Sequence, residues 1–355
     1  MRSISRSTLR LPIALGSLVL AGLTAQRGLA GPPAPPSGDW SSPTIDRWFY
    51  PFNASPGVRQ TISTFGSTPG DSLFDSRDGQ FYMVFDTDDQ IPTGDWMGTN
   101  LRVAKARVTI MVVNDVAVYD PTPDAWQSFV GEADLDWQAD ADAGQPIELF
   151  AAGYRNDWSA ATFVEAGPFA PTGASVLLPG VRNVFLGESD LKGEVTDASS
   201  HVRDDRDAQS LAVATCSTVV PGDILTNGSV LTFEIDCSVP ETQAYLAANL
   251  QAGRLPLIAS SLTFVVQGGG NYPAFYSKEN PLVILGAANA ATLEVTLGYS
   301  CAPADIDCSG TVEGADLAML LGNWGNPGGD GGNTDLDGSG TTDGADMAIL
   351  LGAWQ

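Results

Sequence analysis

Histidine and positive charge are scarce in this sequence of 355 residues. It holds one histidine, and its 17 Lys and Arg residues stand against 42 Asp and Glu residues, for a formal net charge of −25. The lone His201 excludes zinc sites built from several histidines, and its Asp- and Arg-rich surroundings predict a surface position. The shortage of positive charge argues against anionic partners, namely nucleic acid and acidic membrane surfaces.

Long apolar runs are also missing, except near the N-terminus. Residues 11–25 carry no charge, and this run of 15 residues is shorter than the roughly 20 that a spanning helix needs. Three arginines precede it, and the small residues of Gly-Leu-Ala end at Ala30. We therefore predict a signal peptide over residues 1–30 and a secreted, extracellular protein, free or attached to the cell surface. A retained membrane anchor is the alternative.

The predicted mature chain is still more acidic. Cleavage after Ala30 removes four arginines, which leaves 13 basic residues against 42 acidic ones and a formal charge of −29. No later segment is long and apolar enough to be predicted as a membrane span.

Cysteine is rare as well, with four in the chain. An even number in an exported protein predicts two disulfides, and four cysteines allow three connectivities. The spacing favours the local pairs Cys216–Cys237 and Cys301–Cys308. The sequence also lacks a nucleophile elbow, a phosphate loop and a dinucleotide fingerprint in a suitable context, so no residue is assigned to catalysis.

What the sequence does contain is a series of short apolar or alternating runs. They are bounded by Gly, Pro, Asn or Asp, which is typical of strands and their turns, and lie at residues 80–85, 106–113, 230–235, 261–266 and 291–297. Residues 241–252 are the one helix expected before the tail. After a Pro-rich spacer at 31–39, residues 40–300 are therefore predicted to be mainly β, as one or two jelly-roll-like β-sandwiches.

A short internal similarity leaves the number of sandwiches open. Residues 75–80 (DSRDGQ) resemble residues 204–209 (DDRDAQ) at an offset of 129. A true duplication would divide the region into related halves at 45–170 and 171–300.

The C-terminus carries a much clearer repeat. Residues 305–324 and 335–354 agree at most positions with a period of 30. Numbered from its first Asp, each loop has oxygen-bearing residues at positions 1, 3, 5, 7, 9 and 12: Asp305, Asp307, Ser309, Thr311, Glu313 and Asp316 in the first, and Asp335, Asp337, Ser339, Thr341, Asp343 and Asp346 in the second.

This spacing is typical of calcium loops. Calcium takes six to eight oxygen ligands, and a glycine at position 6, here Gly310 and Gly340, allows the sharp turn that brings them together. Apolar residues then recur at i, i+3, i+4 and i+7, which predicts one amphipathic helix after each loop. The stripes are Leu317, Leu320, Leu321 and Trp324, and Met347, Leu350, Leu351 and Trp354. We expect two Ca²⁺ ions in a small α-helical module over 301–355.

This tail resembles dockerin modules, and its Gly-Ala-Asp-Leu…Leu-Leu-Gly-x-Trp motif resembles that of the GC-type dockerin anchors of secreted proteins. The resemblance implies docking to a cohesin-like protein through positions 10 and 11, which are Gly314 and Ala315 in the first loop and Gly344 and Ala345 in the second. Serine at position 5 departs from the family, which prefers Asp or Asn. The alternative is that calcium only folds the tail and no partner exists.

The end of the large region, residues 231–299, resembles DNRLRE-type extracellular sandwich modules, which are similar to carbohydrate-binding modules. The Ser277-Lys278-Glu279 turn carries part of this resemblance, which implies a β-sandwich and association with sugars. Most aromatic residues of this region are expected to fill the core, and Trp96 and Trp126, in loops rich in Gly, Asp and Pro, are the better candidates for exposure and stacking on a sugar. The carboxylates of Asp134, Asp136, Asp140 and Asp142 are interpreted as a calcium site or solvated surface in preference to a catalytic set.

We therefore expect a secreted, anchored, non-catalytic β-sandwich protein that binds polysaccharide and carries a calcium-dependent docking tail. One alternative is a dockerin-tethered polysaccharide-degrading enzyme, either a glycoside hydrolase or a lyase. The other is a structural surface component.

Overall fold

The computed structural model of the protein describes residues 34–96, 101–265, 271–307, 309, 311–326 and 334–354. The predicted signal peptide, the first residues of the spacer, Cys308 and Gly310 lie outside the described residues.

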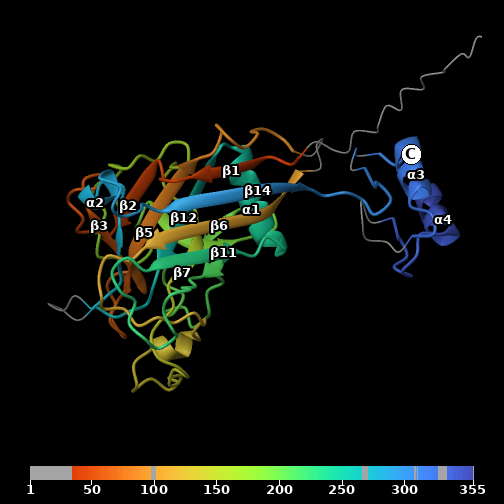
Figure 1. Ribbon diagram of the computed structural model, residues 1–355. Coiled ribbons are helices and arrows are strands. Elements are labelled where there is room, and N and C mark those ends of the chain that lie inside the picture. Colours follow the sequence, from red (N-terminus) through yellow and green to blue (C-terminus); the bar gives the residue numbers. More distant parts are fainter. Residues whose placement is uncertain are drawn as a thin grey trace, which may run out of the picture.

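The described chain is mainly β, as predicted, with antiparallel pairing throughout its named strands (Figure 1). Its strands are β1 (Ser37–Trp40), β2 (Ile45–Phe49), β3 (Thr61–Ser63), β4 (Phe65–Gly66), β5 (Arg77–Asp86), β6 (Leu101–Met111), β7 (Glu148–Tyr154), β8 (Val184–Ser189), β9 (Val195–Asp197), β10 (Ala212–Val213), β11 (Val230–Ile235), β12 (Arg254–Ser260), β13 (Ala274–Tyr276) and β14 (Thr292–Tyr299). The helices are the 3₁₀ turn η1 (Trp126–Phe129), α1 (Pro240–Gln251), α2 (Pro281–Ile284), α3 (Gly314–Gly322) and α4 (Gly344–Gly352).

A four-stranded sheet has the order β1-β14-β6-β11. Buried and more exposed residues alternate along β6, β11 and β14, because successive side chains of a strand point to opposite faces. The inward set includes Val108, Phe233 and Leu293, which are fully buried. This sheet therefore covers an apolar core with one face and presents the other to solvent.

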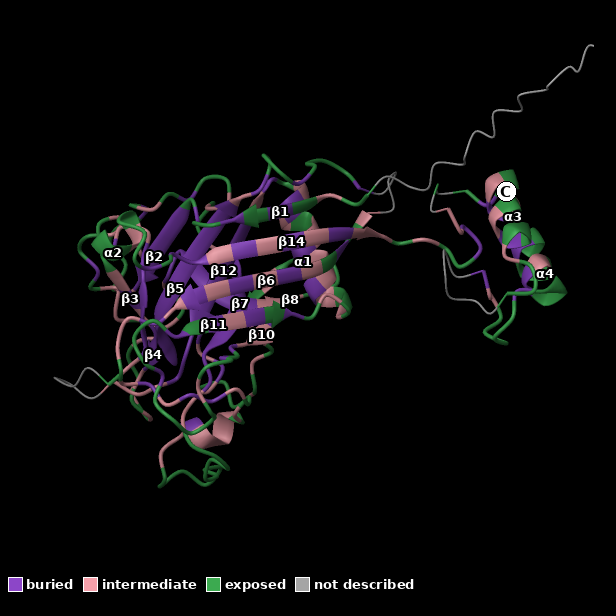
Figure 2. Cartoon of the chain, in the orientation of Figure 1, coloured by how far each residue is buried: buried purple, intermediate pink, exposed green. Residues whose placement is uncertain are grey.

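The larger sheet has the order β2-β5-β12-β7-β8-β9 and is covered on both faces over its central strands. In β5, Phe81, Met83 and Phe85 enter the core shared with the first sheet, whereas Tyr82 and Val84 enter a second apolar cluster. Figure 2 shows these central strands buried along their length. Their apolar residues are therefore continuous rather than alternating.

Strands from residues 45–170 and 171–300 are neighbours in both sheets. β12 lies between β5 and β7, and β14 and β11 flank β6. Inward side chains of both sheets form one shared core, an arrangement consistent with a β-sandwich. The two similar segments also differ in structure, since residues 75–80 lead into β5 whereas residues 204–209 form turns and irregular chain.

Most of the predicted elements are present. The strands expected at 80–85, 106–113, 230–235 and 291–297 correspond to β5, β6, β11 and β14, and the expected helix corresponds to α1. The prediction of a strand at 261–266 is wrong, because the regular strand of that region is β12, which ends at Ser260. None of the described helices has the length and apolar character required to cross a bilayer.

The predicted Cys216–Cys237 disulfide is wrong, because both cysteines are free. Thr215 bridges to Thr232 in antiparallel fashion, which places Cys216 beside Leu231. Cys237 follows six residues later, and extended chain of that length spans up to about 20 Å, whereas a disulfide needs Cα atoms within about 7 Å. The pairing of Cys301 with Cys308 stays a prediction.

Candidate functional site

The first acidic loop of the tail gathers three carboxylates just before and within the start of α3. Oxygens of Asp305, Asp307 and Asp316, the residues at positions 1, 3 and 12, all lie within 4.8 Å of one another. The backbone N–H of Ser309 donates to Asp305 Oδ1 at 2.9 Å and to Asp307 Oδ1 at 3.0 Å. The loop backbone therefore holds two of the three carboxylates in place.

The second loop repeats this geometry before α4. Oxygens of Asp335, Asp337 and Asp346 lie within 4.8 Å of one another. Ser339 N donates to Asp335 Oδ1 at 3.0 Å and to Asp337 Oδ1 at 2.9 Å. Each of two segments 30 residues apart thus brings together its own three carboxylates, from the same three loop positions. Each loop therefore concentrates negative charge at one place.

The remaining predicted ligands make hydrogen bonds within the loops and at the helix starts. Ser309 Oγ donates to the Thr311 carbonyl at 3.1 Å, and Ser339 Oγ donates to the Thr341 carbonyl at 3.3 Å, so positions 5 and 7 face each other. Asp343 begins α4 as its N-cap, and its Oδ1 accepts from Ala345 N at 2.8 Å.

Position 12 also belongs to the helix start. Asp316 Oδ2 accepts from Glu313 N at 2.8 Å, and Asp346 Oδ2 accepts from Asp343 N at 2.7 Å. The N–H of Asp343, together with those of Asp337 and Leu336, lowers the pKa of the Asp346 carboxyl. This carboxylate therefore stays charged at neutral pH, as a cation ligand must.

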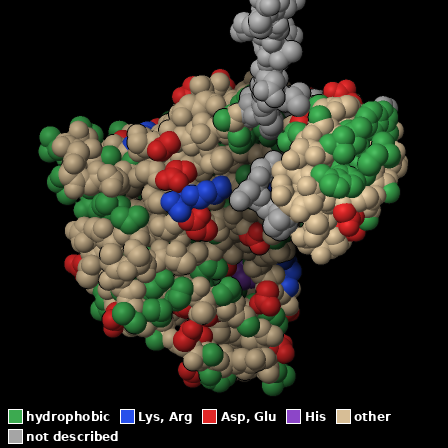
Figure 3. Space-filling view, turned by 45° about the vertical axis from the view of Figure 1, so that its right-hand side comes forward, with side chains coloured by type: hydrophobic (Ala, Val, Ile, Leu, Met, Phe, Trp, Pro, Cys, Tyr) green, Lys and Arg blue, Asp and Glu red, His purple; other side chains and the backbone are tan. Residues whose placement is uncertain are grey.

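The two tail helices pack on each other through a very small core. Ala304, Val312, Leu320 and Leu350 are its buried members, and Leu317 and Met347 pack against it. The other half of each predicted stripe faces outward: Leu321 and Trp324 are 50% and 47% exposed, and Leu351 and Trp354 are 47% and 44% exposed. Figure 3 shows hydrophobic side chains gathered on one face of the tail.

The predicted docking positions lie in the first turn of each helix. Gly314, Gly344 and Ala345 are exposed and Ala315 is half-buried. They are therefore accessible at equivalent places of the two repeats.

A further acidic group occurs in the long connection from β6 to β7. Oxygens of Asp120, Asp124 and Asp142 lie within 4.8 Å of one another. All four members of the predicted cluster are exposed, and only Asp142 joins this group; Asp134, Asp136 and Asp140 lie outside it. Burial and the nearby carboxylates, Asp140 first among them, raise the pKa of Asp124 to about 8.

A fourth group of carboxylates already has its own cation. Oxygens of Asp46, Glu165 and Glu279 lie close together, and Lys278 Nζ reaches all three, at 3.3, 2.5 and 3.3 Å respectively. Lys278 therefore neutralises the place that a metal would occupy. Lys278, in the Ser277-Lys278-Glu279 turn, also donates its backbone N–H to Asp46 Oδ2 of β2 at 2.6 Å.

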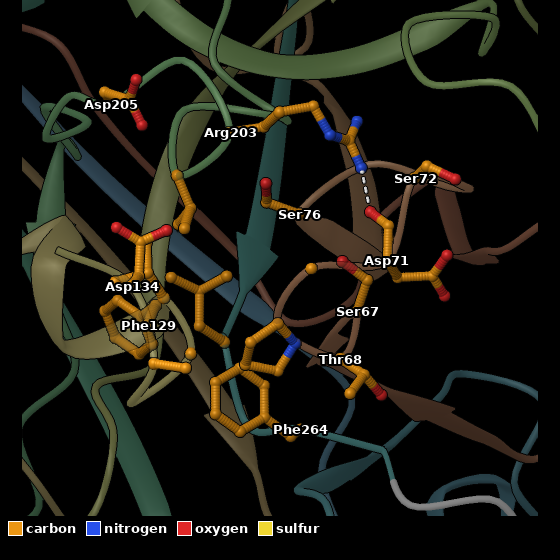
Figure 4. Close-up of a pocket in the computed structure, with 17 residues that line it drawn as sticks. Ser67, Thr68, Asp71, Ser72, Ser76, Phe129, Asp134, Arg203, Asp205 and Phe264 are labelled. Carbon is orange, nitrogen blue, oxygen red and sulfur yellow. Dashed lines mark hydrogen bonds between the residues drawn. The ribbon is translucent and has the colours of Figure 1, made fainter. Parts of the chain in front are cut away.

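A cavity of about 590 Å³ opens beside the β6–β7 connection. Figure 4 shows the rings of Phe129 and Phe264 near each other, with Arg203 reaching towards Asp71 on another side. The two rings meet edge to face, and Arg203 donates to the Asp71 carbonyl at 2.9 Å. Apolar faces, hydroxyls, a cation and carboxylates thus line a single hollow, which also contains Ser67, Thr68, Ser72, Ser76, Asp134 and Asp205.

The expected exposure of Trp96 is wrong. Its side chain is 4% exposed and its Nε1 donates to the Pro92 carbonyl at 2.9 Å. Trp126 is half-buried, and its backbone N–H donates to Asp207 Oδ1. Trp137, in the same loop, is 37% exposed.

The expected surface position of His201 is also wrong, since its side chain is 3% exposed. Its Nδ1 contacts the Arg206 carbonyl at 2.9 Å, and its Nε2 accepts from Arg77 Nε at 3.1 Å. Arg77 also pairs with the buried Glu148. Burial and the Arg77 charge lower the pKa of His201 to about 3, so the ring is neutral and structural.

Comparison with protein-family models finds no match, and comparison with curated proteins finds no relative.

Proposed function

We propose that the protein is a secreted, non-catalytic β-sandwich protein whose C-terminal tail is a calcium-dependent, dockerin-like docking module. The observation that carries the proposal is the repeated focus of three carboxylates, Asp305, Asp307 and Asp316 in one loop and Asp335, Asp337 and Asp346 in the other. Three negative charges at such separations repel strongly, and a divalent cation with oxygen ligands removes that repulsion.

The size of the tail core supports a metal-dependent fold. The four buried apolar residues in the described part of the tail bury too little surface to offset the conformational entropy that folding this segment costs. Calcium bound at both loops would contribute that missing stability, as metals do in other small domains.

The exposed halves of the helix stripes support docking. Leu321 on α3 and Leu351 on α4 are about half exposed, and so are Trp324 and Trp354, each two residues past the end of its helix. An outward apolar surface of large side chains is typical of a protein interface. We propose a cohesin-like protein as its occupant, because the resemblance of the repeats to dockerins implies that partner.

The calcium proposal is tested by counting ions bound to the full chain in equilibrium dialysis. A variant with Asp305→Asn and Asp335→Asn should bind two ions fewer than the native chain, because each substitution removes a charged oxygen from one loop. Asp204→Asn with Asp223→Asn, two exposed carboxylates elsewhere, is the matched control and should bind the native number. An unchanged count in the loop variant would refute the tail sites.

The cavity supports polysaccharide as the ligand of the sandwich. Sugars are bound by aromatic faces together with hydrogen-bonding side chains, and the half-buried Phe264, with Arg203 and Asp71, offers this combination. A polysaccharide screen of the full chain should score retention and released reducing ends together. Retention without release supports binding, release supports the hydrolase or lyase alternative, and neither result supports a structural surface role.

A further inference from the structure

We propose that Asp120, Asp124 and Asp142 form a third calcium site, in the β6–β7 connection and separate from the tail. Their oxygens lie within 4.8 Å of one another, a spacing that suits shared ligation of one cation. The proposal does not depend on the function of the tail, because no tail residue takes part.

Buried oxygens without a donor are the independent sign of a ligand. The Asp120 side chain is 4% exposed, and its Oδ2 is buried with no hydrogen-bond partner. Asp124 Oδ2 is in the same state, as are the amide oxygens of Gln127 and Gln145 from the same connection. Leaving a buried carboxylate oxygen unpaired is costly, and a bound cation satisfies it.

The proton count at Thr122 agrees with this assignment. Its Oγ1 lies 2.6 Å from Asp120 Oδ1 and 2.6 Å from Asp142 Oδ2. A hydroxyl carries one proton, so it can donate to only one of these two carboxylates. The other contact sets two oxygen lone pairs against each other until a proton or a metal ion intervenes.

The connection itself supplies no positive charge. Residues 112–147 contain eight Asp and Glu residues and no Lys, Arg or His. This differs from the group at Asp46, where Lys278 lies among the carboxylates. The all-oxygen set of three carboxylates and the Thr122 hydroxyl is the kind that calcium takes, and the irregular loop suits its flexible geometry.

The site has a consequence for the cavity. Phe129 and Asp134 line the hollow and belong to the same connection, which has η1 as its single named element. Irregular segments of this length need some constraint to keep one conformation. Calcium at Asp120, Asp124 and Asp142 would therefore fix one wall of the cavity.

The test is the number of calcium ions bound to the full chain with Asp124→Asn and Asp142→Asn together. We expect one ion fewer than the native chain binds, and faster proteolysis within residues 112–147 at saturating calcium. Asp134→Asn with Asp136→Asn is the matched control, since it makes the same charge change at exposed positions of the same loop. It should retain the native count.

Each outcome separates this site from the tail. If the tail sites are absent, the native chain binds one ion and the Asp124→Asn, Asp142→Asn variant binds none. An equal count in this variant and in the native chain overturns the third site, whatever the tail binds. Asp142→Asn alone, at an exposed position, guards against misfolding and should weaken calcium binding at one site at least tenfold.

Discussion

At the scale of single residues, the protein buries charge in paired networks. Arg77 lies between Glu148 and His201, and Arg182 pairs with Asp75 and Asp78, all within the interior. Removing one member of such a network leaves an uncompensated charge, whereas the complete network is tolerated. In the Arg77 network, His201 is the member whose ordinary pKa of 6.5 lies closest to neutral pH.

We therefore predict a pH-dependent contribution from His201. Its folded pKa of about 3 lies below its ordinary 6.5, so unfolding takes up a proton between these values. The stability it confers is fully present above pH 6.5 and is lost as the pH falls towards 3, by up to about 1.4 kcal/mol per pH unit. Urea unfolding of native protein and His201→Gln from pH 4 to 7 measures this difference.

The comparison of the native protein with His201→Gln isolates the contribution of the histidine, although Asp78 contributes in the opposite sense. Burial raises the Asp78 pKa to about 7, so its contribution falls as the pH rises through that range. Both proteins share that term, and it cancels in the difference. A difference in unfolding free energy that is constant from pH 4 to 7 would contradict the assigned state of His201.

Residues whose partners are local could be predicted, and residues whose partners are distant could not. Positions 1, 3 and 12 of each tail loop come together within twelve residues, so spacing alone anticipated their convergence. His201 lies 124 residues from Arg77, and nothing near it in the chain indicates burial. The sequence did not indicate Asp120 as a ligand for the same reason. Its carboxylate group includes Asp142, which lies after η1 in the chain, whereas Asp120 lies before it.

At the scale of elements, strands with one covered face were easy to recognise. β6, β11 and β14 alternate, and each was predicted. β12 was missed because it is buried on both faces and contains Pro256, which argues against a central strand. Pro256 is tolerated because it pairs with Val84 of β5, while the ladder to β7 begins at Leu257.

The edge of the larger sheet depends on one glycine. A Cβ added at Gly187 of β8 would lie 2.1 Å from the Thr196 carbonyl of β9. Backbone cannot yield as a flexible side chain does, so Gly187→Ala should lower the free energy of unfolding by about 1–3 kcal/mol. Urea denaturation measures this loss. Gly131→Ala, where the nearest atom is 3.9 Å away, should change it by less than about 0.5 kcal/mol. Equal effects would contradict the close approach of β8 and β9.

At the scale of the whole molecule, the sheets are assembled from distant segments. β14 lies between β1 and β6, and β12 lies between β5 and β7. A sequence shows that strands exist but not which strands are neighbours, because pairing between remote segments leaves no local pattern. The number of sandwiches therefore stayed open until the order of the strands was known, whereas the tail repeat, being local, was evident.

The sandwich and the tail should be thermodynamically separate. The tail core contains residues from 304 to 350, and the core shared by the sheets contains residues from 40 to 297. Stability effects of regions without shared partners are additive. A chain ending at Ser300 should therefore unfold with the same sandwich midpoint in urea as the full chain, at equal saturating calcium. A chain ending at Ala291 should fail to fold, because it lacks β14 from the middle of a sheet. If the cut at Ser300 lowers the midpoint clearly, the tail contacts the sandwich and stabilises it, and the two parts are not thermodynamically separate.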